Sequence, residues 1–245
     1  MKQEYLDFIY PFLKTLRNYH QHEVIGMENV PEKGRLLVAV NHSLATYDIA
    51  LLCCAIYEEK KRIARPLADR LFFKIPFLGD LTNEFGAVEG NKENAESLLH
   101  NEQLVTVAPG GMREALRPST ERYQILWEKR TGFIKLAIKT GTPIIVATCP
   151  KADDLYDVFE SPFTKWAYQN FKIPLFLARG LGPTPIARPV KLVHFLSQPI
   201  VPPPASEDPV EFAHQAEQLH KKVIKRARLL IGQAIAYRGD SEITV

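Results

Sequence analysis

The fold is decided by the stretch Leu36-Leu37-Val38-Ala39-Val40-Asn41-His42-Ser43-Leu44-Ala45-Thr46-Tyr47-Asp48. Its first five residues are apolar, two of them β-branched, and predict a buried strand; a helical pattern begins near Tyr47. On one continuous strand His42 and Asp48 would lie ~20 Å apart. In one helix they would point to different faces. A strand, a turn and a helix start can bring the two side chains together, and the sequence predicts that arrangement.

The pair formed by His42 and Asp48 is a candidate general base. A carboxylate bonded to one imidazole nitrogen fixes the tautomer and leaves the other nitrogen free to accept a proton. Such a pair can deprotonate a bound hydroxyl without a serine or cysteine nucleophile. The alternative is structural: Asp48 is favoured in a first helical turn by the helix dipole, and His42 is an ordinary loop histidine.

Composition limits the class of protein. The chain has 245 residues, of which 46% are hydrophobic and 24% charged, as is ordinary for one globular domain. A net charge of +3, without zinc-ligand spacing or a stripe of basic and aromatic residues, argues against a nucleic-acid partner. Cys53, Cys54 and Cys149 lie in apolar surroundings without a CxxC spacing, which favours buried thiols in a reducing compartment.

No stretch of the sequence reads as a membrane span or a signal peptide. Met1 and Lys2 are followed by mixed polar and aromatic residues, and the longest apolar run, residues 49–57, has about half the length that a span needs. We therefore expect no membrane-spanning helix.

Residues 3–20 have apolar and aromatic side chains at three- and four-residue spacings, which predicts an amphipathic helix that is kinked or broken at Pro11. Two interpretations stay open. The helix packs on its own domain, or it lies on a bilayer with Lys14 and Arg17 towards the headgroups.

The rest of the chain alternates strands and helices, which predicts one α/β domain with a mostly parallel central sheet flanked by helices. We place the amphipathic helix at residues 1–21 and the domain at 22–245. Strands are expected at 23–25, 36–40, 104–108, 144–148, 174–178 and 190–196, and helices at 47–60, 91–100, 124–140, 153–172 and 208–236.

Two turns add candidate binding residues. Pro109-Gly110-Gly111-Met112-Arg113 follows a buried strand, so backbone N–H groups of the glycines and the forked donors of Arg113 suit a phosphate or an oxyanion. The alternative is a surface turn with a solvated arginine. Gly86-Ala87-Val88-Glu89-Gly90-Asn91 is weaker and can be an ordinary strand-to-helix turn. Basic residues at 221–228 form either a solvated helix face or a contact with anionic lipid.

Taken together these motifs resemble the glycerolipid (lysophospholipid) acyltransferase family, over roughly residues 22–200. His42 to Asp48 resembles its histidine–aspartate motif, 85–90 its second motif, 109–113 its third and 142–145 its fourth, in the same order and at matching intervals.

The chain departs from the family pattern at three positions. Five residues rather than four separate His42 and Asp48, Gly110 stands where the third motif has a glutamate, and Gly90 stands where the second motif has an arginine that holds the acceptor's phosphate. This combination is most similar to the neutral-lipid, diacylglycerol-acyltransferase-like branch.

The resemblance implies an O-acyltransferase. It would move a long-chain acyl group from acyl-CoA or acyl carrier protein to a mono- or diacylglycerol or lysophospholipid hydroxyl, with His42 as base and Asp48 as its orienting partner. Gly110 and Gly111 would hold the oxyanion, Arg113 a phosphate, and Glu89 and Gly90 would lie at the acceptor. It further implies no metal and no cofactor, and a cytoplasmic protein peripheral at the inner face of a membrane.

Apolar segments at 70–79 and 159–181 are candidates for the acyl groove. Two functions from other classes stay open: an acyl-thioester hydrolase, in which the same base activates water, and a non-catalytic lipid-binding protein. The extra residue between His42 and Asp48 keeps the second of these open.

Overall fold

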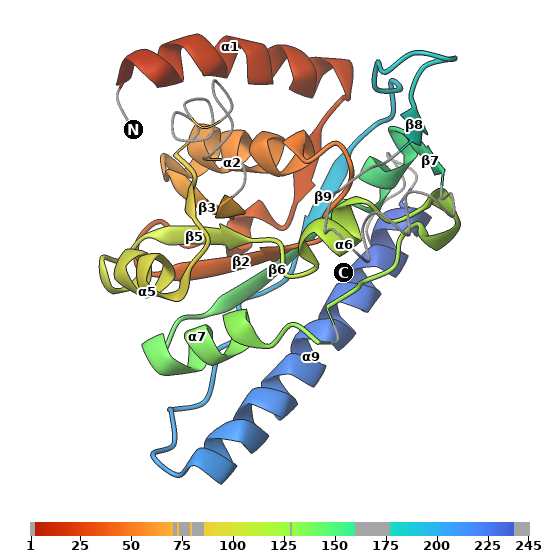
Figure 1. The fold of residues 1–245 in the computed structure, drawn as a ribbon. Helices are drawn as coiled ribbons and strands as arrows, with labels where there is room; N and C mark the ends of the chain where they lie inside the picture. Colours follow the sequence, from red (N-terminus) through yellow and green to blue (C-terminus); the bar gives the residue numbers. More distant parts are fainter. Residues whose placement is uncertain are drawn as a thin grey trace.

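A computed structural model describes residues 3–70, 73, 79, 86–127, 129–159 and 177–237, with the side chains from residue 9 onward (Figure 1). The strands are β1 (Glu23–Ile25), β2 (Leu36–Val40), β3 (Ala64–Ala68), β4 (Val88–Glu89), β5 (Leu104–Val107), β6 (Ile144–Thr148), β7 (Asp157–Phe159), β8 (Leu177–Arg179) and β9 (Val193–Leu196). The helices are α1 (Gln3–Tyr19), α2 (Tyr47–Lys60), α5 (Lys92–His100), α6 (Gly111–Ala115), α7 (Gly132–Thr140) and α9 (Pro209–Ala236).

Seven strands form the central sheet in the order β1-β9-β6-β2-β5-β3-β4. Neighbouring strands are parallel except for β6 and β9, which are antiparallel. The mostly parallel sheet expected from the sequence is therefore confirmed. The strand of the deciding stretch, β2, lies at the centre, where β5 and β6 pair with it on either side.

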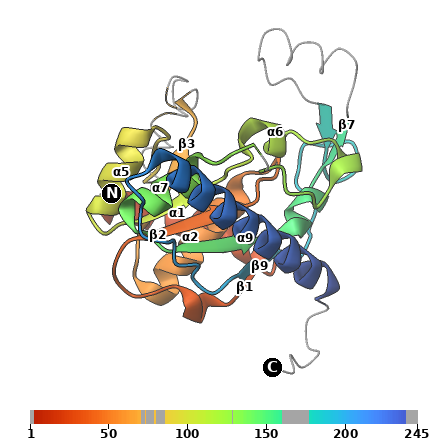
Figure 2. The ribbon, with the colours of Figure 1, turned by 90° about the horizontal axis from the view of Figure 1, so that it is seen from below.

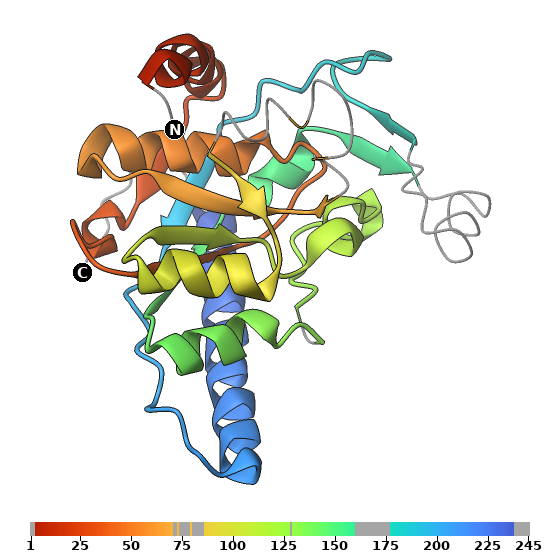
Figure 3. The ribbon, with the colours of Figure 1, turned by 60° about the vertical axis from the view of Figure 1, so that its left-hand side comes forward.

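Helices cover both faces of this sheet, as Figure 3 shows from the side. Residues Leu36, Val38 and Val40 of β2 pack with α2 on one face. The alternate residues, Leu37 and Ala39, pack with α5, α7 and α9 on the other. A central parallel strand that is buried on both faces requires a continuous apolar run, which explains why β2 is uniformly hydrophobic.

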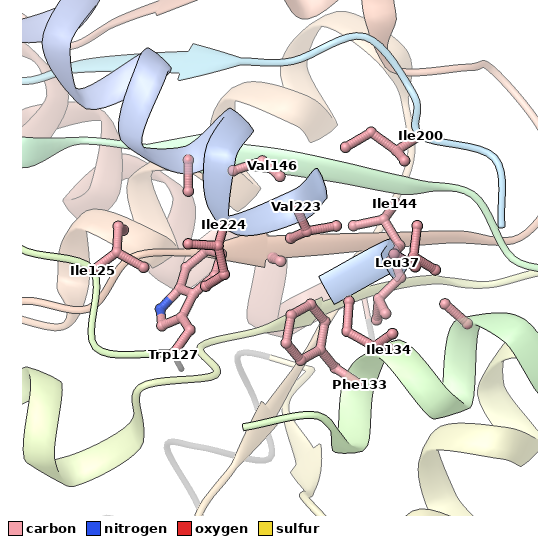
Figure 4. Packing of buried hydrophobic residues seen from close by; sticks show 14 of the residues in the cluster. Leu37, Ile125, Trp127, Phe133, Ile134, Ile144, Val146, Ile200, Val223 and Ile224 are labelled. Carbon is pink, nitrogen blue, oxygen red and sulfur yellow. The ribbon is translucent and has the colours of Figure 1, made fainter. Parts of the chain in front are cut away.

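The long helix α9 crosses the second face diagonally (Figure 2). It begins at Pro209, and the preceding Asp208 caps it by accepting the N–H groups of Val210 and Glu211. Figure 4 shows Val223 and Ile224 of α9 packed beside Trp127 and Phe133, in the larger of the buried clusters.

The N-terminal helix α1 continues through Pro11 as one helix, so of the expected kink or break the break is excluded. Its residues Ile9 and Leu13 are buried with Leu51 of α2, and Arg17 forms an ion pair with Glu58. This face of the helix packs on the domain, which agrees with the first of the two interpretations of residues 3–20. Within the described residues no helix has both the length and the apolar character of a membrane span.

Other boundaries differ from expectation. The helix expected from residue 124 starts at Gly132, because Ile125 and Trp127 turn into the core on an extended segment. The strand expected at 174–178 corresponds to β8, which pairs antiparallel with β7 outside the main sheet. A helix was expected over 153–172, but β7 forms at residues 157–159, so this part of the helix prediction is wrong. Residues 160–172 and most of the two segments expected to line an acyl groove lie outside the described residues.

Candidate functional site

The loop that carries His42 leaves the sheet between the ends of β2 and β6. The side-chain oxygen of Asn41 accepts the backbone N–H of Cys149 at 2.7 Å, which ties the two strand ends together. The loop ends at Thr46, whose φ of 58° is unusual for a β-branched residue, and α2 starts at the next residue. The expected strand, turn and helix start are therefore all present.

Asp48 lies in the first turn of α2 and is fully buried. Its Oδ1 accepts a hydrogen bond from Oγ of Ser43 at 3.0 Å. Burial raises the pKa of Asp48 to about 7, against the smaller lowering by the Ser43 hydroxyl. A carboxylate in such a position is costly to leave without a partner.

Two side-chain atoms of this stretch are buried without a hydrogen-bond partner among the described residues. Nδ1 of His42 and Oδ2 of Asp48 are both buried, and neither has a hydrogen-bond partner among the described residues. No hydrogen bond therefore joins these two atoms in this structure. Burial and the nearby Arg117 charge lower the pKa of His42 to about 4, so its imidazole is neutral at pH 7. The general-base role of the pair stays a prediction.

One wall of a pocket of about 1360 Å³ contains His42. Most of the lining is apolar and comes from α1, α2, β3, α5 and α7. Its apolar and aromatic members include Ile9, Tyr10, Leu13, Ile49, Tyr57, Leu67, Val107, Phe133, Leu136 and Phe212. A mostly apolar concave site with a few polar groups is the usual form of a small-molecule site.

Cationic side chains gather at the part of the pocket formed by α7 and the residues before it. Lys129 and Arg130 precede α7, Lys135 and Lys139 lie one turn apart on it, and all four are exposed. Lys92 of α5 also lines the pocket and pairs with Glu96 at 3.8 Å. An anionic group on an otherwise apolar ligand is complementary to this arrangement.

The third motif contributes Pro109, Gly111 and Met112 to the pocket wall. Gly111 has a φ of 54°, and its N–H already donates to the carbonyl of Ala108 at 3.1 Å. Arg113 lies outside the lining, is largely exposed, and donates to Glu121 at 2.7 Å. Gly110 is likewise not part of the lining, so the structure brings Gly111, but not Gly110 or Arg113, to the pocket that His42 lines.

The second motif brings Gly90 to the same pocket. Its N–H donates to the carbonyl of Ala68 at 2.8 Å, at the end of the β3–β4 pair. Glu89 lies outside the lining, with Arg70 at 3.9 Å from its carboxylate. Gly90 therefore adds backbone and no charge to the wall.

Sequence reasoning missed two buried charged residues beside the histidine, Glu114 and Arg117. Both lie just past the third motif, in a run that reads as an ordinary short helix and turn. Nothing in their spacing indicates that they reach a loop more than 70 positions earlier. Among the residues that the structure describes, no group of three or more histidine, cysteine or carboxylate side chains could hold a metal ion.

Comparisons with known proteins agree with this architecture. The model of the family described as "Acyltransferase" matches residues 21–149. The "DGAT1/2-independent enzyme synthesizing storage lipids" of Bos taurus is 32% identical over 214 residues, 87% of this chain and 60% of that protein. The Mus musculus protein of the same name is 33% identical with the same coverage. The chain thus spans about 60% of the length of these relatives.

The fold is also that of a solved bacterial enzyme. The crystal structure of the 1-acyl-sn-glycerophosphate (LPA) acyltransferase PlsC from Thermotoga maritima superposes with a TM-score of 0.63, at 19% identity, over 96% of this chain and 81% of that one. Since the family model covers more than half of the chain and includes the histidine loop, the third motif and the strands between them, this protein belongs to the acyltransferase family.

Proposed function

We propose that this chain transfers a long-chain acyl group from a thioester to the hydroxyl of a neutral glycerolipid, with His42 as general base. One observation carries the proposal: His42, six residues before the buried carboxylate of Asp48 in the first turn of α2, lies in the wall of a large, mainly apolar pocket. An acyl chain gains about 0.8 kcal/mol per buried methylene in such surroundings.

In the proposed reaction, the acceptor hydroxyl gives its proton to Nε2 of His42 while its oxygen attacks the thioester carbonyl carbon. The carbon–sulfur bond then breaks, and the leaving thiolate takes the proton from the imidazolium. Asp48 would accept Nδ1–H of His42, which supplies the missing partner for both unpartnered atoms and stabilises the charged ring. Hydrogen bonds of this kind are often long before substrate binds.

The cationic part of the pocket supports a donor with phosphate groups. Lys135 and Lys139 project from one face of α7 into the lining, with Arg130 just before that helix. The phosphates of acyl-CoA, or of the phosphopantetheine of an acyl carrier protein, are complementary to these charges. In this proposal these cationic side chains bind the phosphate, which is the role that sequence analysis assigned to Arg113.

The lining at Gly90 supports a neutral acceptor. A phosphomonoester needs fixed cations around it, because a desolvated dianion without partners is costly. Gly90 supplies none at the position where the family pattern has an arginine. The mammalian relatives, whose name refers to the synthesis of storage lipids, support mono- or diacylglycerol as acceptor.

Peripheral association with a membrane is part of the proposal, because these acceptors reside in bilayers. Phe12 of α1 supports it: its side chain is 61% exposed on a helix whose other face is buried. An exposed aromatic residue on an amphipathic helix is typical of interfacial binding.

The test is incubation of the protein with palmitoyl-CoA and, in separate and mixed micelles, monoacylglycerol, diacylglycerol and lysophosphatidic acid, with products identified by mass spectrometry. We expect di- or triacylglycerol, and loss of product in a folded His42→Ala variant, since a general base contributes about 10²–10⁴ in rate. Predominant phosphatidic acid would contradict the neutral acceptor. Free palmitate without acylated lipid would indicate a thioesterase, and no turnover at all a lipid-binding protein.

A further inference from the structure

Two buried charged side chains hold the backbone of His42, one at its N–H and the other at its carbonyl. On one side, Oε2 of Glu114 accepts the backbone N–H of His42 at 3.1 Å. On the other, Nη2 of Arg117 donates to the backbone carbonyl of His42. The anion meets the hydrogen-bond donor and the cation meets the acceptor, so both contacts are charge-assisted and stronger than neutral ones.

Glu114 is anchored independently of this contact. The same Oε2 accepts Nε1–H of Trp127 at 3.0 Å, and Oε1 accepts the backbone N–H of Leu126 at 3.2 Å. Trp127 is completely buried in the cluster under α9 that Figure 4 shows, and its carbonyl lies 3.1 Å from Nε2 of His220. The carboxylate therefore connects the histidine loop to the rigid core.

Arg117 is anchored in the same way. Its exposed fraction is 3%, it donates to the carbonyl of Gln124, and it lies 3.5 Å from the buried carboxylate of Asp153. Burial raises the pKa of Glu114 to about 7, although the Arg117 charge and the three N–H donors each lower it. The cation thus favours the ionised form of Glu114 that accepts three N–H groups.

Glu114 fills the place of a side chain that the third motif lacks. A Cβ atom on Gly110 would lie 2.2 Å from Oε2 and 2.3 Å from Cβ of Glu114, so the Glu114 side chain occupies the space into which a side chain at residue 110 would project. The resembling family has a glutamate at that position. In this chain a carboxylate stands in the same space but comes from four residues later.

We infer that Glu114 is a positioning residue for the proposed acyl transfer, which holds the His42 backbone, and with it the imidazole, against the core. The inference rests on the proposed function and deepens it. His42 lies on an irregular loop, where neither a helix nor a strand fixes its backbone. Displacement of a catalytic group by about 1 Å can lower the rate about 10²-fold, so loss of the contacts that fix the His42 backbone should lower the rate of acyl transfer measurably.

Three variants separate positioning from general stabilisation. Glu114→Ala removes all three accepted hydrogen bonds, while Glu114→Gln retains the bond to His42 when its amide oxygen takes the place of Oε2. Gly110→Ala keeps the charge but forces the whole Glu114 side chain, including its Cβ, to move. Thr140→Val is the matched control, because it removes a buried hydrogen bond, to Thr142 at 2.6 Å, away from the pocket lining.

We expect Glu114→Ala to lower kcat about 10²-fold with KM nearly unchanged. Gly110→Ala should lower kcat in the same direction, and Glu114→Gln should give an intermediate kcat. Thr140→Val should lower the unfolding midpoint but leave kcat unchanged. The inference is overturned if Glu114→Ala loses no more activity than a Thr140→Val protein of equal stability, or if KM alone changes.

A second measurement does not depend on turnover. In NMR spectra of the wild type, the ring resonances of His42 and the indole N–H of Trp127 report on the two ends of the contact. In Glu114→Ala both should shift, and the His42 ring signals should broaden as the ring loses its single position. If the wild type acylates no acceptor, the proposed function fails, whatever the NMR spectra show. If the His42 ring signals are unchanged in Glu114→Ala, the positioning role is overturned, whatever the turnover.

Discussion

The carboxylate of Glu114 accepts the backbone N–H of His42 at 3.1 Å across 72 positions of sequence. This contact joins the residue that follows the third motif to the first motif, and it holds a loop residue rather than a strand or a helix. The proposed chemistry at His42 therefore depends on the groups that surround it.

Asp48→Asn is expected to abolish most acyl transfer, because an amide cannot stabilise the imidazolium and favours the wrong tautomer. Ser43→Ala should have a milder effect. Ser43 donates to Oδ1 of Asp48, so its loss removes a hydrogen bond to the ionised carboxylate and raises the pKa of Asp48 further. The acid limb of the kcat/KM profile should move to higher pH. An unshifted profile in Ser43→Ala would contradict ionised Asp48 as the required form.

Gly90→Arg is expected to increase the use of lysophosphatidic acid relative to monoacylglycerol, because it places a cation in the pocket wall. Gly90→Ala is the control for the backbone, since a Cβ at this position lies 3.2 Å from the carbonyl oxygen of Ala68. Competition between the two acceptors in mixed micelles measures the ratio of products. An identical ratio in both variants would show that residue 90 does not select the acceptor.

The double variant Lys135→Ala/Lys139→Ala should raise KM for acyl-CoA and reduce its dependence on salt, because two cations leave the pocket lining. Arg113→Ala should raise KM less, since Arg113 is bonded to Glu121 outside that lining. Lys221→Ala on α9, which removes an exposed pair with Glu217, is the charge control. A larger effect of Arg113→Ala than of the double variant would return the phosphate site to the third motif.

Phe12→Glu is expected to reduce sedimentation with anionic liposomes and to leave the unfolding midpoint nearly unchanged, because the side chain is 61% exposed. Leu13→Glu, one position further, should unfold α1 from α2, because Leu13 is buried and an unpaired charge there is costly. Equal liposome binding by Phe12→Glu and the wild type would exclude α1 as the membrane contact.

Acid should destabilise the fold through the pair His22 and His194, in which Nε2 of His22 lies 2.9 Å from Nδ1 of His194. Arg17 donates to Nδ1 of His22, so Nε2 of His22 carries the proton and donates to Nδ1 of His194. Burial lowers the pKa of His22 to about 2 and of His194 to about 3. The unfolded chain, titrating near 6.5, binds more protons below that pH, so stability falls between pH 6.5 and about 3.

His22→Gln can accept from Arg17 and donate to His194 without titrating. It should reduce the proton uptake on unfolding by about one and the slope of stability against pH by about 1.4 kcal/mol per unit. Denaturant unfolding across this pH range measures both slopes. Equal slopes in the two proteins would show that His22 does not titrate on unfolding.

The local pattern of the sequence determined much of the fold of this protein. The apolar runs of β2, β5 and β6 require burial on both faces, and helices between them require parallel neighbours, so sequence alone predicted the central sheet. The same local signals placed α2 at Tyr47 and ended the strand before His42. Strand, turn and helix start depend on adjacent residues, and adjacent residues are visible in a sequence.

Only the tertiary structure decided what surrounds the histidine. Arg113 was the expected cation, yet it turns outward to Glu121, whereas the buried Arg117 reaches the His42 carbonyl. Residues 124–127 stay extended because Glu114 binds their N–H groups and Trp127 enters the core. A buried carboxylate must satisfy its lone pairs with donors that the fold brings near, wherever they lie in the chain. Such partners have no period or spacing, so packing, and not sequence pattern, selects them.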